Sequence, residues 1–111
     1  MDYTGKRWLR LRERILKRDN YQCQYNKRYG RLIQANTVHH ILPVEQYPQY
    51  QYCEWNLISL SKEAHNIMHD RDSHELTDEG LKLQERLKRK LQNDKRNSTI
   101  LERRAMDRQV R

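Results

Sequence analysis

The sequence has little of what a large hydrophobic core requires. Its 111 residues include no phenylalanine, three glycines and two prolines, and only 22 of them are Leu, Ile or Val. This share of aliphatic residues is close to the level below which a highly charged chain stays unfolded. Two stacked domains are therefore excluded, and the single small domain that we expect is of a kind that often depends on a bound metal ion.

Long apolar runs and paired cysteines are also missing. No stretch approaches the roughly 18 consecutive apolar residues of a membrane span, and residues 1–6 lead into a charged segment rather than the apolar run of a signal peptide. Cys23 and Cys53 belong to no CxxC pair, which excludes a disulfide framework and a four-cysteine zinc site. We expect a soluble, cytoplasmic protein with free thiols and no membrane partner.

Positive charge, in contrast, is plentiful. There are 23 Lys and Arg against 15 Asp and Glu, a formal net charge of +8, and such a surplus favours a polyanionic partner through counterion release. The residues Lys6–Arg18 predict an amphipathic helix, with Trp8, Leu11 and Ile15 on its apolar side and Leu9 and Leu16 beside them. We expect the opposite side to contact the phosphates of a nucleic acid through Arg7, Arg10, Arg14, Lys17 and Arg18.

Turn, strand and helix signals alternate along the rest of the chain. Residues 21–33 predict a short hairpin or knuckle, with turns at 26–27 and 29–31. Residues 37–42 are the most strand-like run, and Pro43 ends it. Residues 61–70 predict a helix of about three turns. A second helix begins at Thr77, its predicted N-cap, and continues through Leu83, Leu87 and Leu91.

Four histidines and an asparagine lie within 31 residues, at positions 39, 40, 56, 65 and 69. His65 and His69 are spaced i, i+4, which places both imidazoles on one face of a helix. His39 and His40 are consecutive on a strand and point to opposite faces, so a single ion does not reach both without a bend. One of them can complete a three-histidine metal site, and the other is left to accept a proton near neutral pH.

These motifs resemble the HNH endonucleases, and closely the small stand-alone HNH proteins of bacterial phages and prophages. The resemblance spans Trp8 to Arg71. Asn56 follows His40 by 16 positions and precedes His65 by 9, which suits the ββα-metal motif. The matching segments read LRERILKRDNYQC at 11–23, ANTVHHILP at 35–43, NLISL at 56–60 and HNIMHDR at 65–71.

The resemblance implies a role for each residue of the cluster. His39 is expected to bind one divalent ion, whether Mg²⁺, Mn²⁺, Ni²⁺, Co²⁺ or Zn²⁺, together with His65 and His69. His40 is expected to be the general base that activates water. Asn56 is expected to orient the loop at the site through hydrogen bonds from its side chain to the backbone. Arg71 is a further candidate for phosphate contact, and no small-molecule cofactor is implied.

The resemblance also implies the architecture. We expect an α+β fold with a ββα-metal core over residues 35–71 and flanking N-terminal and C-terminal helices. Residues 1–92 would form the endonuclease domain, and 93–111 a charged tail that is frayed helix or disordered. Many relatives also hold a structural zinc in two CxxC knuckles. The corresponding pairs here are Cys23 with Asn26 and Ser61 with Ala64, so we predict no structural zinc.

Two functions remain open. The first is a metal-dependent DNA endonuclease of low sequence specificity, which the family context places in phage DNA packaging beside the terminase and portal proteins. The second is a non-catalytic, basic nucleic-acid-binding or packaging protein derived from such a nuclease. The complete set of histidines and asparagine favours the enzyme, because decay without selection is expected to alter these residues as well as the zinc positions.

Overall fold

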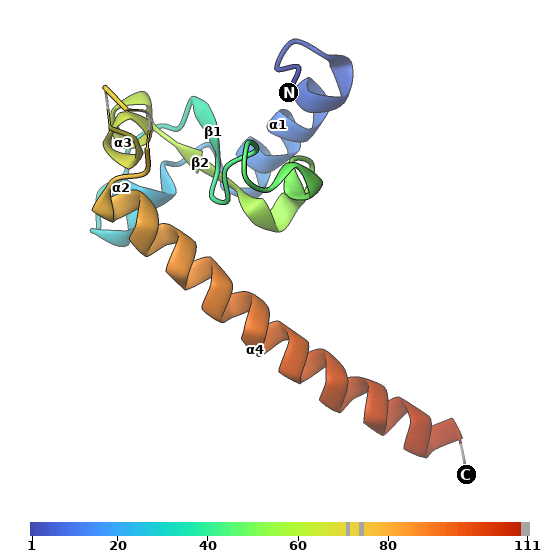
Figure 1. Ribbon diagram of the computed structural model, residues 1–111. Coiled ribbons are helices and arrows are strands. Elements are labelled where there is room, and N and C mark those ends of the chain that lie inside the picture. The colour runs from blue at the N-terminus through green and yellow to red at the C-terminus, as the bar shows by residue number, and fades with distance from the viewer. Residues whose placement is uncertain (71, 74, 110–111) are drawn as a thin grey trace.

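A two-stranded sheet with helices on either side forms the body of the molecule in the computed structural model (Figure 1). The structure describes residues 1–70, 72–73 and 75–109, and it describes side chains as far as residue 94. The predicted α+β class is confirmed. The elements are α1 (Lys6–Arg18), α2 (Gln24–Arg28), β1 (Thr37–His40), η1 (Pro48–Tyr50), η2 (Glu54–Asn56), β2 (Leu57–Leu60), α3 (Lys62–Met68) and α4 (Asp78–Gln109).

The strands β1 and β2 pair antiparallel, with Thr37 opposite Leu60 and His40 opposite Leu57. Successive residues of a strand face opposite sides, and the two sides of this hairpin have different neighbours. Val38 and Leu57 pack in the core formed with α1, whereas the ring of His39 lies against α3. The helices α1 and α3 therefore cover opposite faces of the hairpin (Figure 1).

The helix α1 has the predicted bounds, and its apolar side forms the main core. Trp8, Leu11, Ile15 and Leu16 are each at most 4% exposed and pack with Ala35, Val38 and Leu57. Of the two residues predicted to lie beside this apolar side, Leu16 is buried, whereas Leu9 is 49% exposed. Helical periodicity places it at the edge of the stripe, beyond the reach of the sheet.

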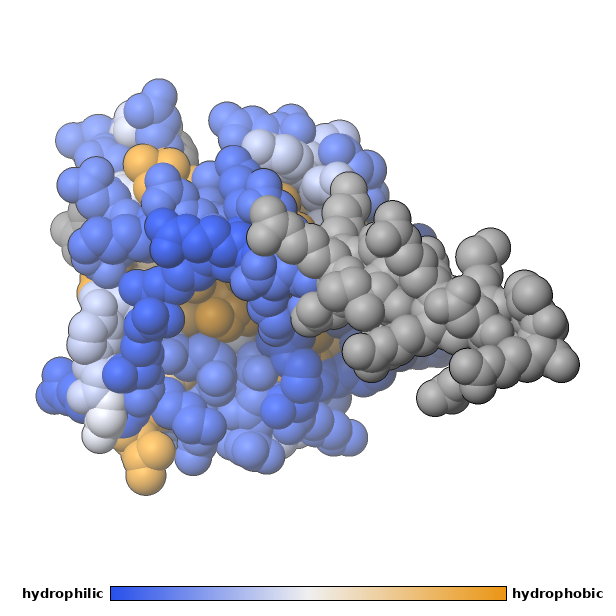
Figure 2. Space-filling model, turned by 90° about the horizontal axis from the view of Figure 1, so that it is seen from below, coloured by the Kyte–Doolittle hydropathy of each residue, from blue (hydrophilic) through white to orange (hydrophobic). Residues whose placement is uncertain are grey.

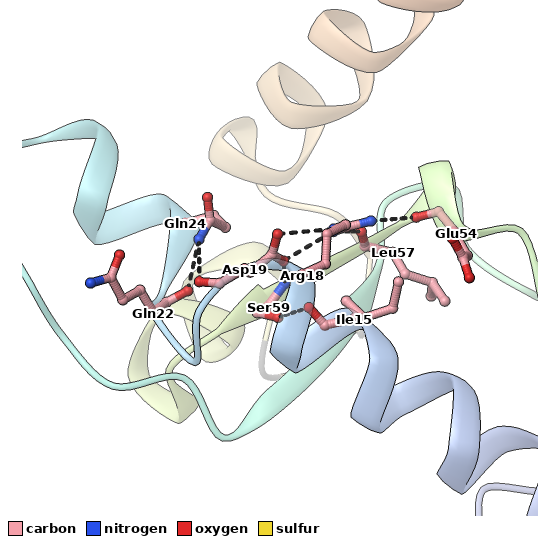
Figure 3. A network of polar contacts seen from close by, with 8 residues as sticks. All are labelled: Ile15, Arg18, Asp19, Gln22, Gln24, Glu54, Leu57 and Ser59. Atoms are coloured by element: carbon pink, nitrogen blue, oxygen red, sulfur yellow. Dashed lines mark hydrogen bonds and ion pairs between the residues drawn. The ribbon is translucent and has the colours of Figure 1, made fainter.

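A polar clasp joins the end of α1 to the outer edge of β2 (Figure 3). The Arg18 guanidinium donates to both carboxylate oxygens of Asp19 at 2.9 Å, to the Glu54 carbonyl at 2.8 Å and to the Leu57 carbonyl at 2.7 Å. Asp19 in turn accepts a hydrogen bond of 3.0 Å from the backbone N–H of Ser59. The clasp thus satisfies backbone groups of η2 and β2 that the two-stranded sheet leaves unpaired.

The segment between α1 and β1 confirms one predicted turn and corrects the other. Gly30 has φ of +76°, the left-handed conformation that glycine adopts without strain, and it turns the chain as predicted. Residues 26–27 lie inside α2 instead of forming a turn. The knuckle is closed by a bridge between Gln22 and Gln34.

The four positions that correspond to the zinc knuckles come together beside α3. The Asn26 amide donates to the Cys23 thiol at 3.2 Å and to the Ser61 hydroxyl at 3.5 Å. Ser61 also caps α3 by accepting the backbone N–H of Ala64 at 3.1 Å. The side chains at these positions are one thiol, one amide, one hydroxyl and one methyl group, which do not form a zinc ligand set. Hydrogen bonds connect them instead.

The helix α3 ends at Met68 and is shorter than predicted, because Thr77 donates hydrogen bonds to the carbonyls of its last turn. The Thr77 hydroxyl donates to the Ile67 carbonyl at 2.6 Å, and the Thr77 N–H donates to the Met68 carbonyl at 3.0 Å. The same hydroxyl accepts the N–H of Gly80 at 3.3 Å, which confirms Thr77 as the predicted cap of α4. A Cβ at Gly80 would lie 2.6 Å from the Met68 carbonyl oxygen, so this close approach requires glycine.

The helix α4 packs on the body through its first turns and then leaves it (Figure 1). Leu87 is buried with Ile41 and Leu42, and Leu83 and Leu91 pack against them, as the predicted apolar pattern requires. The helix continues to Gln109, so the division into 1–92 and 93–111 stays a prediction, and residues 110–111 lie outside the described part.

The surface is mainly hydrophilic, as the low content of aliphatic residues predicts. The face seen from below is mainly hydrophilic, and its apolar side chains show in a central hollow and at a few separate points (Figure 2). Scattered apolar residues of this kind are normal on a soluble surface. None of the helices in the described residues has the length and apolar character needed to cross a membrane.

The proximity of the four knuckle positions leads to a first prediction. Replacing Asn26, Ser61 and Ala64 together with cysteine completes a four-cysteine set with Cys23, and we expect it to bind Zn²⁺ tetrahedrally. At a free Zn²⁺ concentration 100-fold above Kd, the bound ion would raise the free energy of unfolding by about 2.7 kcal/mol, measured by thermal denaturation. Co²⁺ titration separates this site from any histidine site, because thiolate ligands give a sulfur-to-cobalt absorption band. A triple variant without that band would contradict the described geometry.

Candidate metal centre and active-site pocket

The free edge of β1 forms the floor of a cavity of about 520 Å³. Trp8 and Arg12 of α1 line one wall, and His65 with His69 lines the opposite wall. Both His39 and His40 line the cavity as well. The cavity therefore joins the two faces of the hairpin at one strand edge.

Three histidines form a triangle on the α3 side of this cavity. The ring centroids of His39 and His65 lie 5.2 Å apart, those of His39 and His69 5.3 Å, and those of His65 and His69 5.5 Å. Their candidate ligand nitrogens all lie within 4.8 Å of one another. The structure thus brings together the three histidines that the family resemblance assigns to a metal ion.

His39 is the buried member of the triangle and is 3% exposed. Burial and the neighbouring imidazoles lower its pKa to about 3, so the ring is neutral at physiological pH. Its Nε2 atom is buried and finds no hydrogen-bond partner among the described residues. A buried, neutral and unsatisfied nitrogen costs free energy unless a ligand fills the position, and it fits a metal ion.

His65 and His69 complete the set from the end of α3. Burial lowers the pKa of His65, and His69 contributes to the same direction, so this ring is also held towards its neutral, metal-binding form. The prediction that both residues lie on one helix was wrong, because α3 ends at Met68 and His69 has extended backbone that bridges to Leu76. Three imidazole nitrogens are a donor set for a divalent transition ion.

His40 lies on the other face of β1, as the alternation of a strand predicts. Its Nε2 lies 3.0 Å from the Gln51 carbonyl oxygen, and since a carbonyl only accepts, Nε2 carries the proton. Its ring stacks on Trp8, with centroids 5.1 Å apart and an angle of 18° between the planes. Burial lowers the pKa of His40, partly opposed by the bond to Gln51, so the neutral ring keeps the lone pair of Nδ1.

Asn56 is fully buried and fixes the long connection between the strands. Its side-chain oxygen accepts the N–H of Leu42 at 2.7 Å. Its amide donates to the carbonyls of Leu42 at 3.1 Å and Tyr50 at 3.2 Å. These are the side-chain to backbone hydrogen bonds expected of this residue, and they hold both ends of the segment that carries Gln51, the partner of His40.

The predicted DNA-binding residues of α1 lie outside the cavity and differ in their surroundings. The Arg7 guanidinium stacks 3.8 Å above the ring of Tyr52, and Arg14 lies 3.6 Å from the carboxylate of Glu54. Exposed positions on the outer side of the helix are held by Arg10 and Lys17. All four residues are exposed, so the predicted phosphate contacts of α1 would be made on its outer surface.

The structure does not test two further predicted contacts. The Arg18 guanidinium is engaged in the clasp with Asp19 and two backbone carbonyls, so it has a structural role, and its contact with DNA stays a prediction. Arg71 lies outside the described residues, so its predicted phosphate contact stays a prediction.

Arg12 lines the cavity and was not among the predicted site residues. Its guanidinium donates to the Asn36 carbonyl at 2.6 Å, at the start of β1. A signal was present in the sequence, since Arg12 lies four residues after Trp8 and four before Leu16, on the apolar side of α1. An arginine on the apolar side of a helix buries its aliphatic part against the core and extends its charged end to a polar surface nearby, which here is the cavity.

Comparison with known proteins gives one informative match. No family model and no curated protein matches the chain. Among solved structures, the chain is similar to the crystal structure of the HNH endonuclease of the deep-sea thermophilic bacteriophage GVE2 with a manganese ion. The two share 33% sequence identity with a TM-score of 0.56, over 58% of this chain and 70% of the phage protein. The similarity therefore holds in both sequence and fold.

The three hydrogen bonds of Asn56 lead to a second prediction. Asn56→Ala leaves the N–H and carbonyl of Leu42 and the carbonyl of Tyr50 unpaired, and we expect the free energy of unfolding to fall by about 3 kcal/mol. Urea denaturation followed by tryptophan fluorescence measures this change. Gln49→Ala removes an exposed amide from the same connection and is expected to change stability by less than about 0.5 kcal/mol. Equal stability of the two variants would contradict the role of Asn56.

Proposed function

This chain belongs to the HNH endonuclease family, and we propose that it is a divalent-metal-dependent DNA endonuclease of low sequence specificity. The observation that carries the proposal is the arrangement around β1. Three imidazoles converge on one face of the strand, and His40, with its tautomer fixed by a backbone carbonyl, lies on the other. A metal site and a separate neutral base beside one cavity are what metal-assisted phosphodiester hydrolysis requires.

The three imidazoles are proposed as the metal ligands. His39, His65 and His69 would hold one divalent ion and leave its remaining positions to water and phosphate oxygens. An ion held there supplies Lewis-acid stabilisation of the negative charge on the phosphate. Imidazole nitrogens suit Mn²⁺, Co²⁺, Ni²⁺ and Zn²⁺ better than Mg²⁺, which prefers oxygen ligands.

His40 is proposed as the general base. Its Nδ1 takes a proton from the attacking water, whose oxygen bonds to phosphorus while the bond to the 3′ oxygen breaks. The products are a 3′-hydroxyl, protonated from solvent, and a 5′-phosphate. The Gln51 carbonyl keeps the proton of the neutral ring on Nε2 and stabilises the imidazolium once it forms, and stacking on Trp8 fixes the ring plane. Asn56 is the positioning residue that holds this connection.

The basic surfaces are proposed to hold the DNA backbone. Arg7, Arg10, Arg14 and Lys17 lie on α1, and residues 81–96 of α4 have a net charge of +5. Phosphate contacts position DNA without reading its sequence, and no described element has the form of a base-reading module, which supports low specificity. We extend the proposal to phage DNA packaging in the host cytoplasm, beside terminase and portal proteins, which the family resemblance implies.

A third prediction tests the base. Because general-base catalysis contributes about 10²- to 10⁴-fold, His40→Ala is expected to lose that much of the nicking rate on supercoiled plasmid. Affinity for DNA and for Mn²⁺ should persist, since His40 holds neither in the proposal. The assay covers Mg²⁺, Mn²⁺, Co²⁺, Ni²⁺ and Zn²⁺. If the wild type binds DNA and nicks it with none of these ions, the non-catalytic DNA-binding protein becomes the better explanation.

A fourth prediction tests the metal ligands. His65→Ala removes one of three imidazoles, and we expect its Mn²⁺ affinity, measured by calorimetry with the metal alone, to fall by more than about 100-fold. His40→Ala is the matched control, because it removes an imidazole from the same cavity outside the triangle. Equal Mn²⁺ affinities of the two variants would show that the triangle is not the metal site.

A further inference from the structure

Arg12 is a cation that lines the cavity and has no part in the proposed chemistry, and its one hydrogen bond described above, to the Asn36 carbonyl, leaves its charge without an acidic partner among the described residues. We propose that its guanidinium forms a second phosphate subsite, which binds a backbone phosphate of the cleaved strand next to the scissile one. The inference rests on the proposed function and adds to it the path that the substrate strand follows.

The position of Arg12 separates this subsite from the reacting centre. Arg12 lies one helical turn after Trp8, the residue that stacks on His40, so α1 presents both along the same wall. The guanidinium is anchored at Asn36, three residues before His39 along an extended strand. At about 3.3 Å per residue, roughly 10 Å separate the anchor from the metal ligand, which leaves room for a different phosphate.

The charge of Arg12 is not neutralised within the described structure. It donates to a backbone carbonyl, that of Asn36, which orients the guanidinium and leaves most of its five N–H donors for a ligand. Its neighbours on α1 differ, since Arg14 lies beside Glu54 and Arg18 beside Asp19. Glu45 is the acidic residue among those lining the cavity. A planar, oriented guanidinium at a cavity wall suits the bidentate binding of a phosphate.

The same geometry indicates the path that a DNA strand would follow across the site. The described sheet consists of β1 and β2 alone, so the outer edge of β1 is open and faces the cavity. A DNA strand lying along this edge would pass the three histidines and then reach Arg12 at the beginning of β1. Arg12 would therefore set which phosphate comes to His40.

The experiment compares two substrates. Arg12→Ala and Arg12→Lys are measured with DNA and with bis(4-nitrophenyl) phosphate, a diester that has no neighbouring phosphate. For Arg12→Ala we expect KM for DNA to rise about 10- to 100-fold, as for the loss of a charge-assisted hydrogen bond. The slope of the logarithm of the DNA-binding constant against the logarithm of salt concentration should become less steep by about 1, which corresponds to the loss of one phosphate contact. Hydrolysis of the small diester and Mn²⁺ affinity should not change, and Arg12→Lys should lie between Arg12→Ala and the wild type.

Arg31→Ala is the matched control, because it removes the same charge from an exposed position outside the cavity. Unchanged DNA binding in Arg12→Ala, or an equal loss on the small diester, would overturn the subsite. In the second case Arg12 would act on the reacting phosphate itself. If the wild type hydrolyses neither substrate, the proposed function fails, and the salt dependence of DNA binding still decides whether Arg12 contacts a phosphate.

Discussion

The attachment of α1 to the outer edge of β2 by Arg18 and Asp19 is the contact on which the rest of the molecule depends. A two-stranded hairpin is not stable by itself, and here it gains its core from α1 on one face and from α3 and α4 on the other. The clasp holds the C-terminal end of α1 on the outer edge of β2. Near the other end of the same helix Trp8 stacks on His40, so the helix that the clasp holds in place also provides one wall of the cavity.

The alternation of side chains along β1 divides the chemistry between two faces. His39 is buried beside two further imidazoles from the end of α3, and both burial and these neighbours lower its pKa and keep it neutral. His40, one residue later, meets a backbone carbonyl and an indole ring. Two adjacent residues of the same type thus have different surroundings because their neighbours come from different helices. A strand edge is a suitable place for this, since both faces open into one cavity.

Local patterns in the sequence were sufficient for part of this structure. The bounds of α1, the start of β1 and the Thr77 cap follow from periodicity and capping chemistry. Spacing indicated a site of three histidines, and the family resemblance selected His39 over His40 for it. The end of α3 and the engagement of Arg18 did not follow, because their partners are distant in the chain: Thr77 lies ten residues after Ile67, and Leu57 lies 39 after Arg18. Arg12 was missed for a related reason, since the pattern assigned basic residues only to the outer face of the helix.

The close approach of Gly80 to the Met68 carbonyl connects the histidine triangle to the start of α4. His69 follows Met68 directly, so the backbone that presents this imidazole rests on the first turn of α4. A ligand bound by His69 would stabilise the folded backbone at Met68 and His69, and it would therefore also reduce the local unfolding of the first turn of α4, which packs against that backbone. Filling the histidine triangle should therefore slow hydrogen exchange at the amides of Gly80 and Leu81. The exchange rates of these two amides would therefore depend on whether the histidine triangle is occupied, although neither amide belongs to the triangle.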